Sequence, residues 1–250
     1  MSTRQAGETR SSAVRALALL SAFDDRHRSL TLTSLARRAG LPLSTAHRLL
    51  AELTEARLLV RRPDQAYEIG ARIWHLGLLS PQTALREAAL PHMQDLVAAT
   101  GHTAHLAVLD GTRALVLERL AGTRSLPTRH SPGRFLPLHC TGVGKALLAH
   151  APAPIRTQVL AELAPHTAHT VTDPRTLGRQ LEQVRRSGVA RSAQEHRLGV
   201  FSLAMPIVDH SGLVAALGLL APVSSPWLSS TVKPLRDAAA AVASSLRRTT

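Results

Sequence analysis

The segment from Pro42 to Leu53 constrains the fold more than any other part of this sequence. Its apolar residues follow the i, i+3, i+4, i+7 spacing of an amphipathic helix without a miss: Ala46, Leu49, Leu50 and Leu53. With a rotation of about 100° per residue, the opposite face is polar or small. It carries Ser44, Arg48 and Ala51, with Thr45, His47 and Glu52 at its flanks. The pattern predicts a helix with one buried face and one hydrogen-bonding face.

A second helix is predicted immediately before this one. Leu35 and Ala36 lie on its apolar side, Thr33 or Ser34 can cap its start, and Gly40 can end it in the left-handed conformation. Two helices joined by a short turn that contains glycine form a helix-turn-helix, and a helical hairpin with a solvated polar face is the alternative. A further helix is expected upstream, with an apolar stripe of Val14, Leu17, Ala18 and Leu20.

The residues that follow favour the helix-turn-helix over the plain hairpin. Residues 58–61 and 65–69 have the composition of two short strands around a turn at Pro63. A strand hairpin directly after the second helix is the wing of a winged helix-turn-helix. Arginines on it, Arg61 and Arg62, would lie along the phosphate backbone of DNA.

Charge supports a polyanionic partner. The formal net charge is +13, although the excess is spread over the whole chain. Between residues 31 and 62, six arginines are opposed only by Glu52 and Glu55. Hydroxyls and guanidinium groups are the side chains that hold phosphates and read base edges. The residues expected to contact double-stranded DNA are Thr33, Arg37, Arg38, Leu43, Ser44, Thr45, His47, Arg48, Arg61 and Arg62.

The remainder of the chain predicts an α+β domain built on antiparallel strands. Asp110-Gly111 is a hairpin signal between two apolar segments, and Asp173-Pro174 can start a helix that Gly188 ends. The expected strands are residues 103–109, 114–120, 201–208 and 213–221, with a turn at 209–212. The expected helices are 83–100, as one helix or two interrupted by Pro91, then 143–149, 174–187, and a last helix starting near Pro234.

Several classes of protein are excluded or disfavoured. Cys140 is the only cysteine, so an intrachain disulfide and a zinc site of several thiolates are excluded. The longest apolar stretch, Leu213 to Val223, is far shorter than the ~20 residues of a membrane helix. With no signal-peptide pattern at the N-terminus, we expect a cytoplasmic protein with no membrane partner.

No constellation of catalytic or metal-binding residues emerges. The segment Gly142 to Lys145 lacks the spacing of a phosphate-binding loop, and His102 and His105 are expected to be structural histidines. His139 and Cys140 are not assigned as a base and nucleophile, because neighbours in an extended chain point to opposite sides. Glu195 has no evident partner. We therefore expect no enzyme activity, no cofactor and no metal.

Several motifs along the chain resemble the IclR family of bacterial transcription regulators. These are residues 41–50 (LPLSTAHRLL), 67–70 (YEIG), 72–77 (RIWHLG), 137–149 (PLHCTGVGKALLA), 195–200 (EHRLGV) and 204–207 (AMPI). The resemblance implies a DNA-binding domain at 1–70, a linker helix at 71–81 and a GAF-like effector-binding domain at 82–250. It also implies a homodimer or a dimer of dimers, and a regulator, here expected to be a repressor, whose affinity for operator DNA depends on a small molecule.

The resemblance also implies where that small molecule binds. The expected lining is Cys140, Thr141, Gly142, Val143, Phe201, Ser202, Gly218 and Leu220. Gly218 and Leu220 stand where family members that sense small acids have hydroxyl residues, which argues against a ligand like glyoxylate. Backbone amides could orient an anion, while Leu220 and Phe201 favour an apolar body. The hypothesis is a carboxylate with an apolar or aromatic part, and the alternatives are a small-molecule enzyme and an architectural DNA binder without a ligand.

Overall fold

The computed structural model describes residues 11–125, 131–209, 212–224 and 228–249. The chain divides into two compact units, Met1–Thr83 and Ala84–Thr250, and each is described by itself. Among the described residues, no helix has both the length and the apolar character that crossing a bilayer requires.

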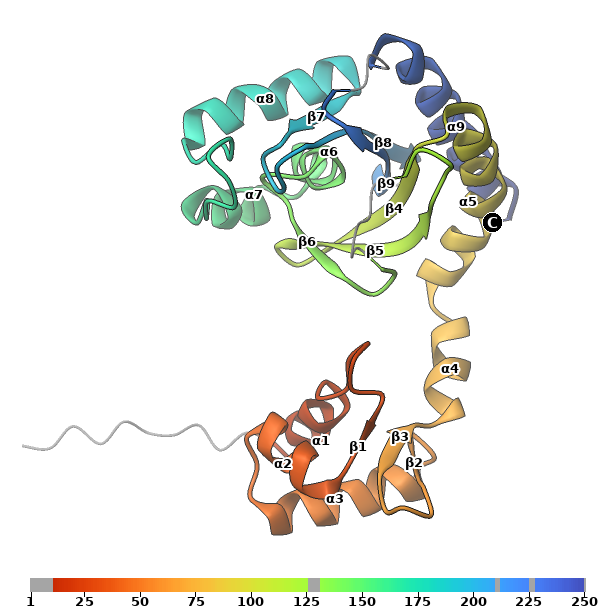
Figure 1. The fold of residues 1–250 in the computed structure, drawn as a ribbon, viewed down its shortest axis with the longest axis vertical. Helices are drawn as coiled ribbons and strands as arrows, with labels where there is room; N and C mark the ends of the chain where they lie inside the picture. Colours follow the sequence, from red (N-terminus) through yellow and green to blue (C-terminus); the bar gives the residue numbers. More distant parts are fainter. Residues whose placement is uncertain (1–10, 126–130, 210–211, 225–227, 250) are drawn as a thin grey trace, which may run out of the picture. The chain divides into compact units, whose positions relative to one another are not determined.

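From residue 11 onward, where the structure describes it, the first unit combines four helices with a small sheet (Figure 1). Its elements are α1 (Ser12–Leu20), β1 (Ser29–Leu30), α2 (Leu32–Ala39), α3 (Leu43–Glu55), β2 (Leu59–Arg61), β3 (Tyr67–Ile69) and α4 (Ala71–Leu78). The strands form an antiparallel sheet in the order β1-β3-β2, so the expected hairpin gains a third strand from the chain before α2. The predicted winged helix-turn-helix is therefore present.

Apolar packing holds α2 and α3 together as the sequence pattern predicted. Ala46, Leu49, Leu50 and Leu53 of α3 are all buried. Gly40 ends α2 in the left-handed conformation, with φ of 65°. The start of α2 differs from the prediction, because Thr31 rather than Thr33 or Ser34 caps it by accepting a hydrogen bond from the backbone of Ser34.

The face of α1 that is buried differs from the one that the sequence pattern predicted. Leu19 is the fully buried residue of this helix, whereas Val14 and Leu17 are 48% and 60% exposed. The helix carries apolar residues on two faces, and only one of them packs against α2 and α3. The other face leaves apolar surface in contact with solvent.

Arg57 takes an unusual conformation between α3 and the wing. Its φ is 58°, in the left-handed region that favours glycine. Its carbonyl oxygen also lies against Gly70, where an added Cβ would be only 2.3 Å away. The chain therefore makes this tight connection without a glycine at the position that turns.

The second unit is a six-stranded antiparallel sheet in the order β6-β5-β4-β9-β8-β7, flanked by helices. Its elements are α5 (Pro81–Thr100), whose first residues belong to the first unit, β4 (Thr103–Asp110), β5 (Arg113–Leu120), β6 (Phe135–Pro137), α6 (Gly142–His150), α7 (Ala153–Ala161), α8 (Pro174–Ser187), β7 (Ala190–Ala193), β8 (Val200–Asp209), β9 (Gly212–Pro222) and α9 (Leu228–Thr249).

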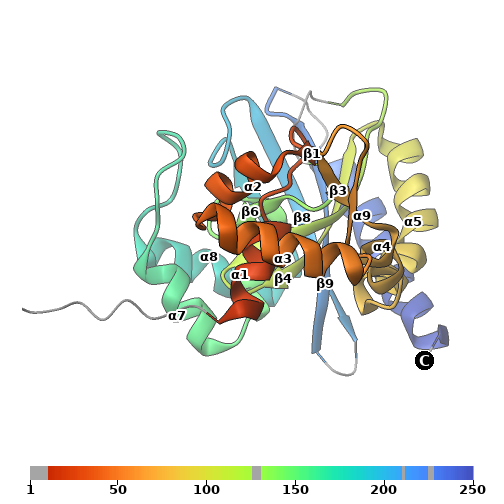
Figure 2. The same ribbon diagram turned by 90° about the horizontal axis from the view of Figure 1, so that it is seen from below.

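Helices cover both faces of this sheet. Figures 1 and 2 show α5 and α9 together on one face, while α6, α7 and α8 lie on the other. Each face has its own core of small and aliphatic side chains. Because side chains alternate between faces along a strand, successive residues of a strand contribute to opposite cores. The helix α6 is buried from Gly142 to Ala149.

Of the two alternatives for residues 83–100, the structure has the single helix, because α5 runs through Pro91 as one element. The last helix differs from the expectation, since α9 begins at Leu228, ahead of Pro234, which lies inside it. The strands β6 and β7, of three and four residues, were not predicted, and neither was the helix α7. The expected turn at 209–212 includes residues 210 and 211, which lie outside the described residues.

Candidate functional site

The outer face of α3 has the composition expected of a surface that contacts DNA. Leu43, Ser44, His47 and Arg48 are exposed, and Thr45 is half-buried. Arg48 forms an ion pair with Glu52 one turn along the helix. Of the predicted contacts on this helix, four point into solvent and only Thr45 is partly covered.

The three predicted contacts on α2 fall into two groups. Thr33 and Arg37 are exposed. Arg38 instead donates to the backbone carbonyl of Ala22 at 2.7 Å and pairs with Asp24 at 2.5 Å. Its guanidinium group fastens the segment after α1 to α2, and its contact with DNA stays a prediction. Arg38 differs from Thr33 and Arg37 because it reaches Asp24, which lies 14 positions earlier in the sequence.

Hydrogen bonds also fix the charge state of Asp24. His27, the backbone amide of Arg26 and Arg38 donate to its carboxylate, and they hold its pKa at about 2, below the ordinary value of 3.8. Asp24 therefore stays ionised, and keeps its pair with Arg38, well into the acid range.

On the wing, both predicted arginines touch other side chains. The guanidinium carbon of Arg61 lies 5.8 Å from the ring centre of Tyr67. Arg62 pairs with Glu68 at 2.8 Å and with Asp64 at 3.6 Å, and these pairs raise its pKa. All of these contacts are at the surface, where ion pairs contribute little to stability and can be exchanged for phosphate contacts.

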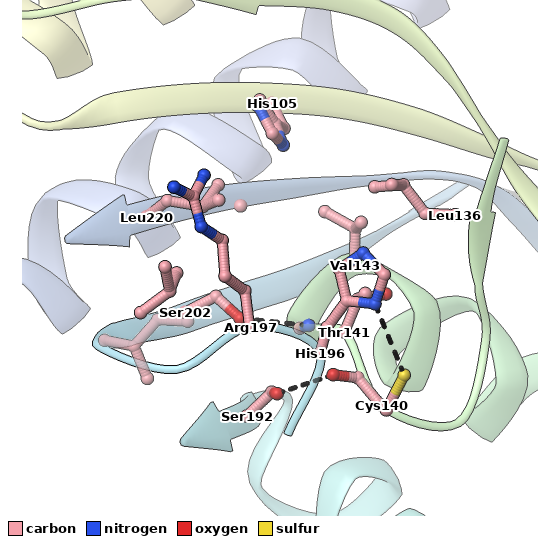
Figure 3. Close-up of a pocket in the computed structure, with 14 residues that line it drawn as sticks. His105, Leu136, Cys140, Thr141, Val143, Ser192, His196, Arg197, Ser202 and Leu220 are labelled. Atoms are coloured by element: carbon pink, nitrogen blue, oxygen red, sulfur yellow. Dashed lines mark hydrogen bonds between the residues drawn. The ribbon is translucent and has the colours of Figure 1, made fainter. Parts of the chain in front are cut away.

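The second unit contains a narrow pocket between the sheet and the start of α6 (Figure 3). It is lined by His105, Leu136, Cys140, Thr141, Gly142, Val143, Ser192, His196, Arg197, Val200, Ser202, Leu203, Gly218 and Leu220. Seven of the eight residues expected in an effector site are among them. The exception is Phe201, which packs into the core beneath α5 and α9 because its side chain leaves β8 on the opposite face from Ser202.

Sequence reasoning missed several of the lining residues. The most consequential are His105, which extends from β4 over the pocket, and Arg197, which rises from the loop between β7 and β8 beside Leu220 (Figure 3). His105 is paired with Gly218 in the register of β4 and β9. Knowledge of this strand register would have predicted His105 as a lining residue, because a residue directly opposite Gly218 lies on the same face of the sheet as Gly218.

Small residues let α6 approach the sheet. Thr141 caps the helix by accepting from the amide of Gly144 at 3.1 Å, and the amide of Gly142 donates to Ser202 Oγ at 3.1 Å. A Cβ added to Gly218 would lie 2.8 Å from a methyl group of Val143. Hydroxyls and an arginine thus lie next to aliphatic side chains in one pocket, an arrangement suited to a ligand with a polar end and an apolar body.

Cys140 is buried at the edge of this pocket. Burial, followed by the charge of Glu195, raises the pKa of the thiol to about 12. A thiol that stays protonated at neutral pH is a poor nucleophile, so the geometry does not favour covalent chemistry. The expectation that His139 and Cys140 point apart was nevertheless wrong, because the chain bends at these residues. A ring nitrogen of His139 and the sulfur of Cys140 lie within 4.8 Å of each other.

Glu195 has a partner that sequence reasoning did not identify. It forms a buried ion pair with Lys145, which also donates to Gln180 at 2.8 Å. Burial lowers the pKa of Lys145, while the hydrogen bond and charge of Glu195 act in the opposite direction. The pair connects α6 to the loop that carries His196 and Arg197.

Comparisons with known proteins agree along the chain. Residues 12–63 match the model of the IclR helix-turn-helix domain, and residues 79–244 match that of the bacterial transcriptional regulator IclR C-terminal domain. The chain is 33% identical to the transcriptional repressor IclR of Escherichia coli, over 85% of this chain and 80% of that protein. It is 31% identical to the probable transcriptional regulator SauR of Cupriavidus necator, over 85% and 86% of the two chains.

Solved structures extend the comparison. An IclR homologue from Microbacterium hydrocarbonoxydans, complexed with 4-hydroxybenzoate, superposes with a TM-score of 0.90 at 33% identity, covering 95% of this chain and all of the other. A regulator from Rhodococcus superposes with a TM-score of 0.80 at 29% identity, over 96% and 99% of the two chains. The likeness therefore covers both units.

Proposed function

The chain belongs to the IclR family of bacterial transcriptional regulators, and we propose on that premise that it is a repressor whose affinity for operator DNA is controlled by a small aromatic carboxylate. Members of this family are regulators of transcription rather than enzymes. The helix-turn-helix domain implies that DNA is a partner. The operator contacts, the sign of regulation and the ligand class are the parts proposed here.

Contact with DNA is assigned to the exposed face of α3. Ser44 can bond a phosphate or a base, and Arg48 can donate two hydrogen bonds to guanine once its pair with Glu52 opens. Arg61 and Arg62 of the wing add phosphate contacts, which strengthen binding without reading sequence. The role of repressor is proposed from relatives such as the Escherichia coli protein.

A homodimer is proposed from the apolar surface of the first unit. Large apolar side chains of α1 and α4 are exposed: Val14, Leu17, Trp74, Leu76 and Leu78. Exposed apolar side chains of this size favour burial against a second copy. A dimer with two recognition helices would read two half-sites related by symmetry, and pairing of dimers remains compatible with this arrangement.

The observation that supports the ligand class best is the mixed lining of the pocket. Arg197 and the hydroxyl of Ser202 can hold a carboxylate, and Leu136, Val143 and Leu220 can cover a flat apolar ring. The Microbacterium homologue is complexed with 4-hydroxybenzoate, an acid of this kind, so the same class is proposed for this chain.

The test measures DNA binding by the full chain with and without ligand. Labelled duplexes from upstream of its own gene are titrated by fluorescence anisotropy, with scrambled duplexes as controls, at several salt concentrations. We expect selective binding that weakens as the salt concentration rises. The affinity for the selected duplex should change when 4-hydroxybenzoate is added and stay the same when the uncharged 4-hydroxybenzamide is added. Equal affinity for all duplexes would contradict the operator assignment, and selective binding that no aromatic acid alters would contradict the ligand class.

A further inference from the structure

Four side chains with metal-binding atoms converge beside the pocket, and we call them the imidazole–thiol cluster: His139, Cys140, His166 and His196. One ligand atom from each of His139, Cys140 and His166 lies within 4.8 Å of the other two. The sulfur of Cys140 is 3.8 Å from Nδ1 of His196. The rings of His166 and His196 are 4.9 Å apart at an angle of 65°.

Three separate loops form the cluster, and hydrogen bonds tie them to one another. Thr167 and Thr170, next to His166, donate to the backbone carbonyls of Gln194 and Glu195 at 2.8 and 2.6 Å. Ser192 donates to the carbonyl of Cys140 at 2.7 Å. The hydrogen bonds therefore hold the loops in place before an ion binds, which reduces the entropy lost when the ligands come together.

Three of the four residues already bring ligand atoms within 4.8 Å of one another, and His196 adjoins them through Cys140. His139 is hydrogen-bonded through Nε2 to the carbonyl of Ala164 at 2.9 Å, which leaves Nδ1 to bind a cation. Metal-binding histidines commonly have this backbone partner on the other nitrogen. Bonds of about 2.3 Å to sulfur and about 2.0 Å to nitrogen put tetrahedral ligand atoms about 3.3–3.6 Å apart. The observed 3.8 Å between Cys140 and His196 needs only a small contraction.

A second observation favours a cation here. One carboxylate oxygen of Glu195 is buried without a hydrogen-bond partner in the described part of the chain, while the other is paired with Lys145. Glu195 directly precedes His196 in the chain, so the same loop carries it to the cluster. A buried carboxylate oxygen left without a partner is costly unless a positive charge or a donor comes close.

We propose that the imidazole–thiol cluster is a binding site for a divalent late transition-metal ion, with Zn²⁺ as the preferred occupant. His139, Cys140 and His166 supply three ligands and His196 supplies the fourth. Imidazole and thiolate together suit Zn²⁺ better than Mg²⁺ or Ca²⁺, which prefer oxygen. His166 is exposed and gives the ion a path from solvent. The thiol proton is released to solvent when Cys140 binds the ion.

The site is independent of the proposed small-molecule ligand, although the two share a wall. Cys140 and His196 line the pocket, whereas His139 and His166 do not. Metal binding can therefore be measured with no organic acid present, and the outcome does not depend on whether the aromatic carboxylate is correct.

The experiment uses the full chain, treated with a chelator and kept reduced with a phosphine. Zn²⁺ is titrated in competition with a chromogenic chelator, and Co²⁺ is added separately to record the absorption spectrum. The variants are Cys140→Ser and His166→Ala. The matched control is His169→Ala, because His169 is also exposed and lies in the same loop three residues away.

We expect one tightly bound Zn²⁺ per chain, a loss of affinity of at least about 100-fold in Cys140→Ser and in His166→Ala, and no loss in His169→Ala. The Co²⁺ complex should show a thiolate-to-metal charge-transfer band that Cys140→Ser abolishes. Because His166 is exposed, His166→Ala should fold normally even if the change at buried Cys140 does not. Absence of stoichiometric Zn²⁺ binding, or equal affinity in His166→Ala and His169→Ala, would overturn the proposal.

Discussion

Lys145 and Glu195 form an ion pair, with 2.5 Å between Nζ and Oε1, at a place where their side chains are only 1% and 8% exposed. Removing one member leaves a buried charge without its partner, a change that costs about 3–5 kcal/mol in other proteins. We therefore expect Lys145→Met to destabilise the second unit by this amount. Urea unfolding, followed by amide hydrogen exchange within residues 84–250, would measure it.

A matched double variant separates the pair from simple packing. Lys145→Met combined with Glu195→Leu replaces both charges with apolar side chains, so it should recover much of the lost stability. If the double variant were as unstable as the sum of the two single variants, the pair would have no coupling energy and the buried ion pair would not be the cause.

The carboxylate of Asp24 predicts how the first unit responds to acid. Its pKa is about 2 in the folded chain against an ordinary 3.8, lowered first by the hydrogen bond from His27. A depressed folded pKa means that the stabilisation is complete above pH 3.8 and is lost as the pH falls towards 2. Asp24→Asn should therefore be less stable than the unsubstituted unit at neutral pH, and the two should converge near pH 2. A stability difference that does not change with pH would contradict this account.

Arg57 predicts a stabilising substitution. Its φ of 58° costs a non-glycine residue on the order of 1 kcal/mol. Arg57→Gly should remove that cost, although part of the gain is offset because glycine makes the unfolded chain more flexible. We expect a small rise in the melting temperature of the first unit. The control is Arg61→Gly in β2, where glycine should destabilise the strand.

The periodic elements could be predicted from the sequence because local chemistry determines them. Ala46, Leu49 and Leu50 share a helix face through their spacing alone, and Gly40 and Gly188 end their helices in left-handed conformations. Four pocket residues, Cys140 to Val143, could be named because they lie in a motif that resembles the family's, and the resemblance also implied Ser202, Gly218 and Leu220.

What could not be predicted depends on contacts between distant segments. Lys145 and Glu195 are 50 positions apart, and His139, His166 and His196 come from three loops without a common spacing. The pairing of Arg38 with Asp24 needs the fold of the loop after α1. Phe201 was misplaced because motif matching ignored the alternation of side chains along β8, which only the strand register makes visible.

Arg48 is the side chain whose removal should affect DNA binding most specifically. If it contacts a base, Arg48→Ala should weaken operator binding by about 1–3 kcal/mol and relax specificity at one position. Arg186→Ala is the control, because Arg186 is a 78% exposed arginine of α8 that carries the same charge. Equal effects of the two changes in a gel-shift titration would indicate that Arg48 acts only through net charge.

Gly218 links the packing of α6 to the pocket, so it predicts coupled losses of stability and ligand binding. A Cβ at this position would lie 2.8 Å from Val143 and 3.1 Å from the carbonyl oxygen of Leu203. The Leu203 oxygen belongs to the neighbouring strand β8 and cannot rotate away, so Val143 and with it α6 must shift, and overpacking of this kind costs about 1–3 kcal/mol. Because both Gly218 and Val143 line the pocket, Gly218→Ala should also weaken the binding of 4-hydroxybenzoate.

The control for this substitution lies in the same unit. Gly178 of α8 has no atom within 4 Å of an added Cβ, so Gly178→Ala should stabilise the helix by up to about 1 kcal/mol and leave ligand binding unchanged. Calorimetric unfolding and isothermal titration with 4-hydroxybenzoate would measure both quantities on each variant. If Gly218→Ala kept full stability, the close approach of α6 to β9 would be wrong. If it lost stability but bound the acid with unchanged affinity, the ligand would have to bind away from Val143.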